Sequence, residues 1–327
     1  MARQAASTGH DPVLYHEIIQ ALQPRSGHRY IDGTLGAGGH AWGILQGSSP
    51  DGLLLGLDVD PQALELARVR LSEFGDRALL FQASYTSLAL RLAEVNWQTV
   101  DGIVLDLGVS SMQLDTPERG FSFQVDVPLD MRFDPHNSVS AANLVNDLPE
   151  EQLAELIYRY GDETAARRIA RAIVRSRPIK TTGQLSGLIV QAVGYPPRRR
   201  GSSQKSGQAH RASLHPATRT FQALRIAVNR ELEALEAVLP QAVAALAPSG
   251  RLAVISFHSL EDRIVKQFFR QESQDCICPP RQPVCVCGHR ASLRLVTRHI
   301  IQPQAAEIEQ NPRSRSARLR VVEKLPV

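Results

Sequence analysis

The segment Tyr30–His40, Tyr-Ile-Asp-Gly-Thr-Leu-Gly-Ala-Gly-Gly-His, is the stretch of this chain whose spacing most directly suggests ligand binding. It is typical of a short buried strand that runs into a glycine-rich turn and opens a helix. Gly36, Gly38 and Gly39 allow positive φ and close backbone approach, and the first turn of the following helix offers unpaired N–H groups. The simpler alternative is a tight turn that needs glycines only for its own geometry.

Polar residues also follow three further apolar runs. Leu53–Asp60 and Val100–Gly108 are nearly continuous apolar segments whose strands end in Asp58 and Asp106, and Tyr85 follows the apolar stretch 78–82. Continuous hydrophobicity of this kind is typical of parallel strands that are covered on both faces. Ligands of such sheets bind beyond the carboxyl ends of the strands. We therefore expect Gly36, Asp58, Tyr85 and Asp106 to converge on one crevice.

The elements that would position these residues alternate between strand and helix as far as residue 111, which predicts a doubly wound parallel α/β sheet. Asp60-Pro61 marks a helix start, with Ala63, Leu64, Ala67 and Leu71 on one face. From 112 to 215 helical patterns follow one another without a strand, which predicts an inserted helical substrate-recognition subdomain. Residues 1–111 and 216–327 would then form one discontinuous domain.

The C-terminal part resumes the alternating pattern. A single long helix is expected from about 221 to 247, a buried strand at 251–257, and a helix that begins at a Ser259–Asp262 capping box. The stretches 294–301 and 317–322 are expected to close the sheet as an antiparallel hairpin.

The ligand of the glycine turn is either a dinucleotide or S-adenosylmethionine. A dinucleotide fingerprint needs a third glycine, but position 41 is Ala, which that fingerprint sometimes tolerates. Asp58 could accept hydrogen bonds from ribose hydroxyls in either case. A strand that ends in Asp106 with a loop directly after it, and a C-terminal hairpin, favour a methyltransferase over an NAD-dependent oxidoreductase.

Seven blocks of the sequence resemble the ribosomal RNA small subunit methyltransferase H family, also called MraW, in the family's order along the chain. They are Tyr30–His40, Asp106–Asp115, Glu118–Phe123, Pro128–Arg132, His215–Arg225, Ile255–Arg263 and Asn311–Ser316. The resemblance implies a class I (Rossmann-like) S-adenosylmethionine-dependent methyltransferase fold. It also implies N4-methylation of a decoding-centre cytidine in 16S ribosomal RNA, either free or in the small ribosomal subunit.

The resemblance further implies which residues contact the cofactor. These are Gly38, Gly39, His40, Asp58, Tyr85, Asp106 and Gln113. Asp106 could accept the proton of the reacting amine or could only hold the cofactor. His258, at the carboxyl end of a strand, is a second catalytic candidate, and a hydrogen-bonded histidine beside a helix cap is its structural alternative.

Candidate RNA-binding residues fall into three groups. Arg119, Phe121, Phe123 and Arg132 follow the strand that ends in Asp106, and the two aromatic rings could stack on bases or belong to a core. Arg313 and Arg315 precede the last predicted strand. The densest basic run could attract the RNA backbone or remain a solvated loop. It comprises Arg198, Arg199, Arg200, Lys205 and Arg211.

All four cysteines, Cys276, Cys278, Cys285 and Cys287, lie within twelve residues, and His289 follows them. They could bind a structural zinc, although zinc pairs are more often Cys-x2–4-Cys than Cys-x-Cys. Reduced thiols in a surface loop are the alternative.

Composition sets wider limits. The chain has 327 residues, 43% hydrophobic content and a net charge of +4, with arginine supplying nearly all of the positive charge. No apolar run reaches the roughly 20 residues of a membrane span, and no secretory signal begins the chain, so we expect a soluble cytoplasmic protein with no membrane partner. Arginine excess agrees with a nucleic-acid partner or with GC-rich coding. Rival interpretations are a non-catalytic RNA-binding protein and another nucleic-acid amino-methyltransferase, although the Asp/Asn-Pro-Pro-Tyr/Phe motif of the DNA enzymes is absent after Asp106.

Overall fold

The computed structural model describes residues 12–194, 215–279, 282 and 284–326. It divides into two compact units. One unit comprises Met1–Gly108 and Leu232–Val327 and contains all strands of the described residues, so we call it the sheet unit. The other comprises Val109–Glu231, and we call it the helical unit.

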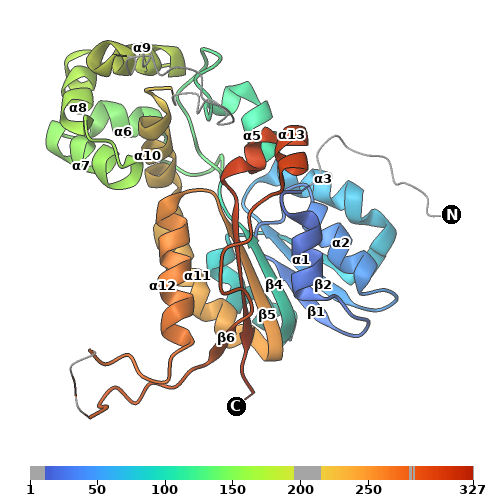
Figure 1. The fold of residues 1–327 in the computed structure, drawn as a ribbon. Helices are drawn as coiled ribbons and strands as arrows, with labels where there is room; N and C mark the ends of the chain where they lie inside the picture. Colours follow the sequence, from blue (N-terminus) through green and yellow to red (C-terminus); the bar gives the residue numbers. More distant parts are fainter. Residues whose placement is uncertain (1–11, 195–214, 280–281, 283, 327) are drawn as a thin grey trace, which may run out of the picture. The chain divides into compact units, whose positions relative to one another are not determined.

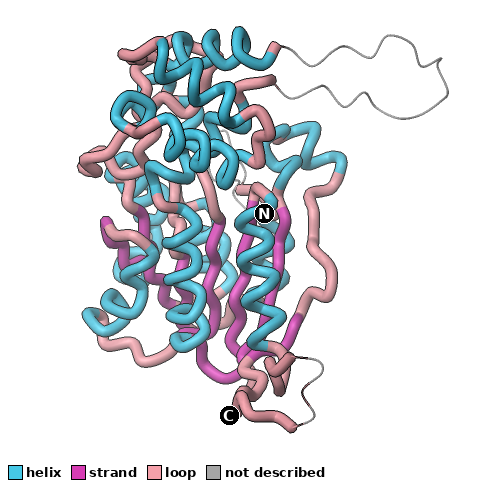
Figure 2. The backbone as a smooth tube through the Cα atoms, turned by 90° about the vertical axis from the view of Figure 1, so that its left-hand side faces the viewer, coloured by secondary structure: helices cyan, strands magenta, loops and turns pink. Residues whose placement is uncertain are grey.

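The sheet unit is built on a seven-stranded sheet in the order β3-β2-β1-β4-β5-β7-β6 (Figures 1 and 2). The first five of these strands are mutually parallel, and β7 pairs antiparallel with both β5 and β6. This arrangement confirms the predicted doubly wound sheet and its closing hairpin. The strands are β1 (Arg29–Asp32), β2 (Leu53–Asp58), β3 (Ala78–Gln82), β4 (Val100–Asp106), β5 (Leu246–Ser256), β6 (Leu293–Leu295) and β7 (Arg318–Lys324).

Helices cover both faces of the sheet, which explains why β2 and β4 are apolar along nearly their whole length. One face is covered by α1 (Tyr15–Leu22), α2 (Gly39–Gly47) and α3 (Pro61–Leu71), and the other by α4 (Leu88–Glu94), α11 (Glu231–Ala245) and α12 (Ser259–Glu272). The short helices of the unit are η1 (Ser72–Arg77), η2 (Tyr85–Ser87), α13 (Ala305–Gln310) and η4 (Pro312–Ser316).

The start of α3 follows directly from its sequence. The side chain of Asp60 accepts a hydrogen bond from the Gln62 N–H at 3.0 Å, and Pro61 is the first helical residue. Ala63, Leu64, Ala67 and Leu71 are buried, as their spacing predicts.

The helical unit has its own apolar core, separate from the two clusters that flank the sheet. Its helices are α5 (Ser111–Asp115), η3 (Pro117–Arg119), α6 (Ala141–Asp147), α7 (Glu150–Gly161), α8 (Ala166–Arg175), α9 (Thr182–Val193) and α10 (Thr218–Asn229). Helix α10 packs against α7 and contributes Phe221 and Leu224 to this core. The unit therefore extends to Glu231, beyond the boundary at 215 that the sequence predicted.

The expected single helix from about 221 to 247 is wrong, because the chain breaks at Arg230. This residue adopts a left-handed conformation with φ 51°, which ends α10 before α11 begins. The Asn229 amide fixes the end of α10, since it accepts a hydrogen bond from Phe133 N–H and donates one to the Met131 carbonyl. Apolar spacing continues through the break, so periodicity alone could not reveal it.

Among the described residues, no helix combines the length and hydropathy required to cross a membrane.

Helix α3 allows a direct test of burial, because it carries one buried and one exposed leucine. Leu64 is 1% exposed and Leu66 is 47% exposed. We expect Leu64→Ala to lower the free energy of unfolding by about 2–5 kcal/mol, and Leu66→Ala to change it by less than about 0.5 kcal/mol. Urea denaturation followed by circular dichroism measures both. Equal losses would contradict the packing of α3 on the sheet.

Candidate functional site at the carboxyl ends of the parallel strands

The glycine turn lies between β1 and α2, at the carboxyl edge of the sheet. Gly36 and Gly38 have φ of 52° and 78°, a region that L side chains rarely adopt. The Gly38 N–H donates to the Leu35 carbonyl at 2.8 Å, which tightens the turn before α2 starts at Gly39. These two glycines are required by the backbone, as the sequence predicted.

Asp58, the last residue of β2, holds this turn. One carboxylate oxygen accepts the Gly36 N–H at 2.7 Å, and the other accepts the Asp60 N–H at 2.9 Å. Burial raises the pKa of Asp58 to about 6, while these two backbone hydrogen bonds oppose the rise. Asp58 is therefore mostly ionised at neutral pH, and each oxygen keeps a second lone pair for a ligand hydroxyl.

Asp32, the last residue of β1, is a site residue that the sequence analysis missed. It is 1% exposed, Oδ1 accepts the Thr34 N–H at 3.1 Å, and Oδ2 has no hydrogen-bond partner in the described part of the chain. Burial raises the pKa of Asp32 to about 7, opposed by the nearby His40. A signal was available, because an acid at the end of a buried strand had already singled out Asp58 and Asp106.

Thr34 connects the glycine turn to β4. Its side-chain oxygen accepts the Asp106 N–H at 2.6 Å, so the ends of β1 and β4 are fixed to each other. His40, the second residue of α2, is buried, and its Nε2 lies 3.6 Å from Oδ2 of Asp106, too far for a hydrogen bond. Thus Asp32, His40, Asp58 and Asp106 all lie around the glycine turn.

This edge carries an unusual number of unsatisfied polar atoms. Both ring nitrogens of His40, Oδ2 of Asp32 and Oδ1 of Asp106 are buried without a hydrogen-bond partner among the described residues. Most buried polar atoms in folded proteins do have a partner. The carboxylates of Asp58 and Asp106 add negative charge to this edge, and a cationic ligand group would favour the ionised form of Asp32 as well. Such an edge suits a ligand with hydroxyl or cationic groups and opposes a pyrophosphate.

Tyr85 and Gln113 stand in different surroundings. Tyr85 is the first residue of η2, which follows β3. A Cβ atom placed on Gly33 would lie 3.4 Å from the Cβ of Tyr85, so Tyr85 lies beside the glycine turn. Gln113 belongs to the helical unit and is the third residue of α5, where its side chain accepts the Ser110 N–H at 3.0 Å. Its cofactor contact remains a prediction.

His258 caps α12, so the predicted Ser259–Asp262 box is displaced by one residue. The ring Nδ1 accepts the Glu261 N–H at 3.4 Å, and Nε2 lies 3.1 Å from Oε1 of Glu261. Glu261 in turn accepts the Phe257 N–H at 2.8 Å. Both ring nitrogens of His258 thus face Glu261, an arrangement that gives its ring a capping role.

Arg119 and Arg132 use their guanidinium groups inside the helical unit. Arg119 donates to the carbonyls of Arg132 and Phe133 at 3.0 and 2.8 Å. Arg132 forms two hydrogen bonds to the Asp130 carboxylate and two more to the carbonyls of Pro135 and Asn137. These contacts hold the loop before α6 in place and leave few donors for RNA.

The two aromatic residues of the same segment contact the apolar core of the helical unit. Phe121 lies 5.6 Å from the ring of Phe133, and Phe123 lies 4.5 Å from the ring of His215 and 5.1 Å from Phe221. Of the two roles open from the sequence, the packing supports the core role. The basic run Arg198, Arg199, Arg200, Lys205 and Arg211 lies outside the described residues.

Arg313 and Arg315 are exposed on η4, immediately before β7. The first residue of β7, Arg318, is paired with Ser256, the last residue of β5. Since β5 lies beside β4, η4 is at the same edge of the sheet as Asp106. The structure therefore brings these two arginines to the edge that holds the glycine turn.

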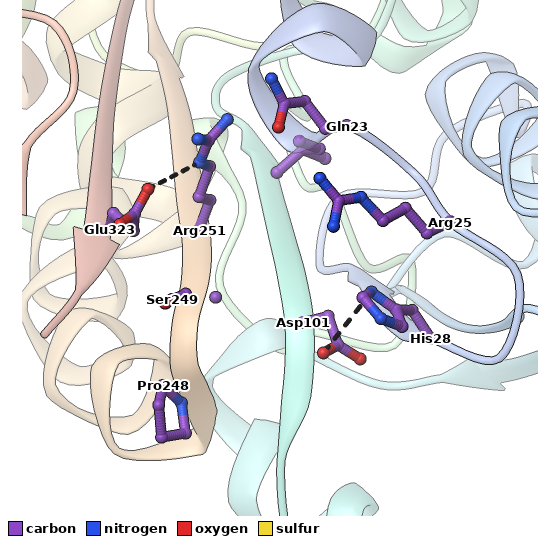
Figure 3. A pocket seen from close by; sticks show the side chains of 10 residues that line it. Gln23, Arg25, His28, Asp101, Pro248, Ser249, Arg251 and Glu323 are labelled. Atoms are coloured by element: carbon purple, nitrogen blue, oxygen red, sulfur yellow. Dashed lines mark hydrogen bonds and ion pairs between the residues drawn. The ribbon is translucent and has the colours of Figure 1, made fainter. Parts of the chain in front are cut away.

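A pocket of about 180 Å³ lies at the opposite, amino-terminal edge of the sheet (Figure 3). It contains two charge pairs, Arg251 with Glu323 at 3.1 Å and His28 with Asp101 at 3.6 Å. Its position at the start of the parallel strands is the wrong end for a ligand site of this fold. We do not assign the pocket to the candidate site.

Comparison with known proteins gives a consistent result. Residues 7–325 match the MraW methylase family. A protein of Thermomicrobium roseum named ribosomal RNA small subunit methyltransferase H is 51% identical, over 98% of this chain and 94% of its own. Proteins with the same name from Dehalococcoides mccartyi and Citrifermentans bemidjiense are 51% and 52% identical, each over 97% of this chain and over 86% and 98% of their own.

The raised pKa of Asp32 predicts a specific pH dependence. Native Asp32 holds its proton up to about pH 7, whereas an unfolded Asp releases it near about pH 4. The native protein therefore loses stability as the pH rises between these values. Asp32→Asn cannot ionise, so its free energy of unfolding should rise relative to wild type across this window, by on the order of 2–4 kcal/mol.

Urea denaturation at several pH values measures this difference. Asp51→Asn is the control of opposite sign, because hydrogen bonds from Ser26 and the Gly27 N–H lower the pKa of Asp51. The ionised Asp51 carboxylate stabilises the native state above the pKa of an unfolded Asp. The free energy of unfolding of Asp51→Asn should therefore lie below that of wild type, and this difference should vary with pH only at the acid end of the range. A pH-independent difference for Asp32→Asn would refute the burial of a titrating acid there.

Proposed function

Because the chain belongs to the MraW methylase family, we propose that it transfers a methyl group from S-adenosylmethionine to ribosomal RNA of the small subunit. The target we infer is the exocyclic N4 of a decoding-centre cytidine in 16S RNA. Near-full-length relatives named for methylation of small-subunit ribosomal RNA support the substrate class. The carrying observation is the edge around the glycine turn, where Asp58 holds the backbone and buried oxygens of Asp32 and Asp106 lack a hydrogen-bond partner among the described residues.

The residues of this edge fit the cofactor. Asp58 would accept hydrogen bonds from the ribose hydroxyls with its remaining lone pairs, and Tyr85 would pack its ring on the adenine. Gly36 leaves open space for the methionine part, whereas a Cβ at Gly38 or Gly39 would meet Leu71 or Pro12 of the chain itself. The unsatisfied oxygen of Asp32 would face the positive charge of the sulfonium and amino groups of the cofactor, which would favour the ionised form of Asp32. An NAD-dependent oxidoreductase would instead place a pyrophosphate here, against the carboxylates of Asp58 and Asp106.

The reaction requires two things of the protein: alignment of the amine with the methyl group, and one proton acceptor. A cytosine amine is a poor nucleophile, because its lone pair is delocalised into the ring. The cofactor supplies a methyl group that its sulfonium already activates, so the chain must hold the amine in line with it. Oδ1 of Asp106 is free to accept an amine hydrogen, which would localise the lone pair and take up the proton.

RNA binding requires positive charge near this edge. Arg313 and Arg315 supply it in the sheet unit, on an exposed turn at the carboxyl edge. Arg119 and Arg132 would act indirectly, by keeping the shape of the segment that follows Asp106. Selection of the cytidine is then a task of the helical unit, where the base would be taken out of its RNA stack.

The substrate assignment is tested on ribosomal RNA itself. Small subunits from cells that lack the protein should accept about one methyl group each from labelled S-adenosylmethionine, and mass spectrometry of the nucleosides should show N4-methylcytidine. Subunits that already carry the methyl group serve as the control. Transfer to a different base would overturn the cytidine assignment, and no transfer would overturn the proposed activity.

Asp106 can be tested separately as proton acceptor and as cofactor contact. Asp106→Asn keeps the shape and removes the charge, so we expect methyl transfer to fall by about 10²–10⁴-fold while the cofactor dissociation constant changes only a few-fold. Single-turnover transfer and isothermal titration calorimetry measure the two quantities. A parallel loss of both would leave Asp106 as a cofactor contact only.

His258→Asn provides the matched comparison, because Asn is itself a good helix cap. If the ring only caps α12, transfer by this variant should stay within a few-fold of wild type. A loss as large as that of the Asp106 variant would instead give His258 a direct catalytic role.

A further inference from the structure

The loop between α12 and β6 contains the four cysteines and lies outside the candidate site. Its base is closed by two contacts between its ends: the Ser292 N–H donates to the Glu272 carbonyl at 2.8 Å, and the Ser292 hydroxyl donates to the Glu272 carboxylate at 2.7 Å. Beyond this base the described residues form neither helix nor strand. The cysteine pairs stand on the two arms of the loop and face each other.

The four sulfur atoms converge on one point. All four Sγ atoms lie within 4.8 Å of one another. Cys276 and Cys285 are 3.5 Å apart across the loop, Cys285 and Cys287 are 3.6 Å apart, and Cys287 and Cys276 are 3.8 Å apart. The short Cys-x-Cys spacing thus does not prevent both pairs from reaching a common centre.

These separations match those of a tetrahedral metal site. A zinc ion bonds thiolate sulfur at about 2.3 Å, so the sulfurs at the corners of its tetrahedron are about 3.8 Å apart. A disulfide would bring two sulfurs to about 2.05 Å, and no pair approaches that distance. Thiols are weak hydrogen-bond donors and acceptors, so sulfur–sulfur hydrogen bonds alone would stabilise such a cluster of exposed thiols only slightly.

Backbone N–H groups surround the sulfurs as they do in thiolate sites. The Val286 N–H points at Cys278 Sγ at 3.5 Å. Cys276 receives a backbone hydrogen bond from Cys278, and Cys287 receives one from His289. Gly288, with φ 62°, makes the turn that brings the His289 amide back to Cys287. Such outer contacts stabilise the negative charge of metal-bound thiolates.

We propose that Cys276, Cys278, Cys285 and Cys287 bind one zinc ion as a closed tetrathiolate site. Binding releases the four thiol protons, and all four positions are filled by protein, so the site is structural and has no place for a water or substrate. The ion would hold together the outer part of a loop whose base is already joined at Glu272 and Ser292. His289 does not belong to the group of ligand atoms that lie within 4.8 Å of one another, and its Nε2 is 3.0 Å from the Gln271 carbonyl.

The test uses the full chain, produced with zinc in the medium and purified under reducing conditions without chelator. Elemental analysis should find about one zinc per chain, and Cys278→Ser and Cys285→Ser should each lower this content about tenfold or more. Val284→Ala, an exposed residue between the ligands, and His289→Ala should keep it. Cobalt substitution should give the absorption bands of a tetrahedral thiolate complex.

The wild-type protein provides a second measurement that does not depend on the folding of the variants. Metal-free reduced protein, titrated with zinc alone, should bind one equivalent and become resistant to proteolysis within 273–292. Four thiols that react freely with a thiol reagent in the presence of zinc, or a Cys276–Cys285 disulfide found by mass spectrometry under these conditions, would overturn the proposal. Loss of methyl transfer alone would not, because the site is proposed from sulfur geometry and not from activity.

Discussion

The Asp58 carboxylate is the interaction on which the candidate site depends. It accepts a hydrogen bond from the Gly36 N–H, which holds the glycine turn, and one from the Asp60 N–H, which fixes the backbone just after β2. These two bonds are charge-assisted and partly buried, where such bonds are strong. The backbone also ties the turn to β2, because the Leu35 N–H donates to the Leu57 carbonyl at 2.9 Å, and the Asp58 carboxylate extends this attachment by one residue to Gly36. The same carboxylate that would recognise a ribose therefore also builds the wall against which the ribose would lie.

The sheet was predictable because its signals are local. Apolar runs that end in acids, and starts such as Asp60-Pro61, need only a few neighbouring residues to be understood. The acids at strand ends were likewise correctly expected to share one edge, since parallel topology forces this. Asp32 was overlooked although it follows the same pattern as Asp58, because the glycines of the same motif drew the interpretation to the turn that follows it.

Other features depend on partners that are distant in sequence. The sequence near Arg230 carries no signal for the break between α10 and α11. Contacts of Asn229 with residues almost a hundred positions earlier fix this break. Arg119 and Arg132 were predicted to contact RNA because a sequence shows which residues are charged. It does not show that their guanidinium groups donate to backbone carbonyls of the helical unit. A basic residue in a loop is thus ambiguous until its surroundings are known, and only the structure shows that Arg313 and Arg315 are exposed.

The discontinuity of the sheet unit has a consequence for how the chain folds during its synthesis. The helical unit is one continuous segment and can fold as soon as it has been made. Strand β4, however, has its neighbour β5 on the far side of that segment, and β7 pairs with the other edge of β5. One edge of β4, the strand that ends at Asp106, therefore stays unpaired until the whole helical unit and then β5 have been synthesised, and the compact fold of the intervening segment has to form while that edge is still open.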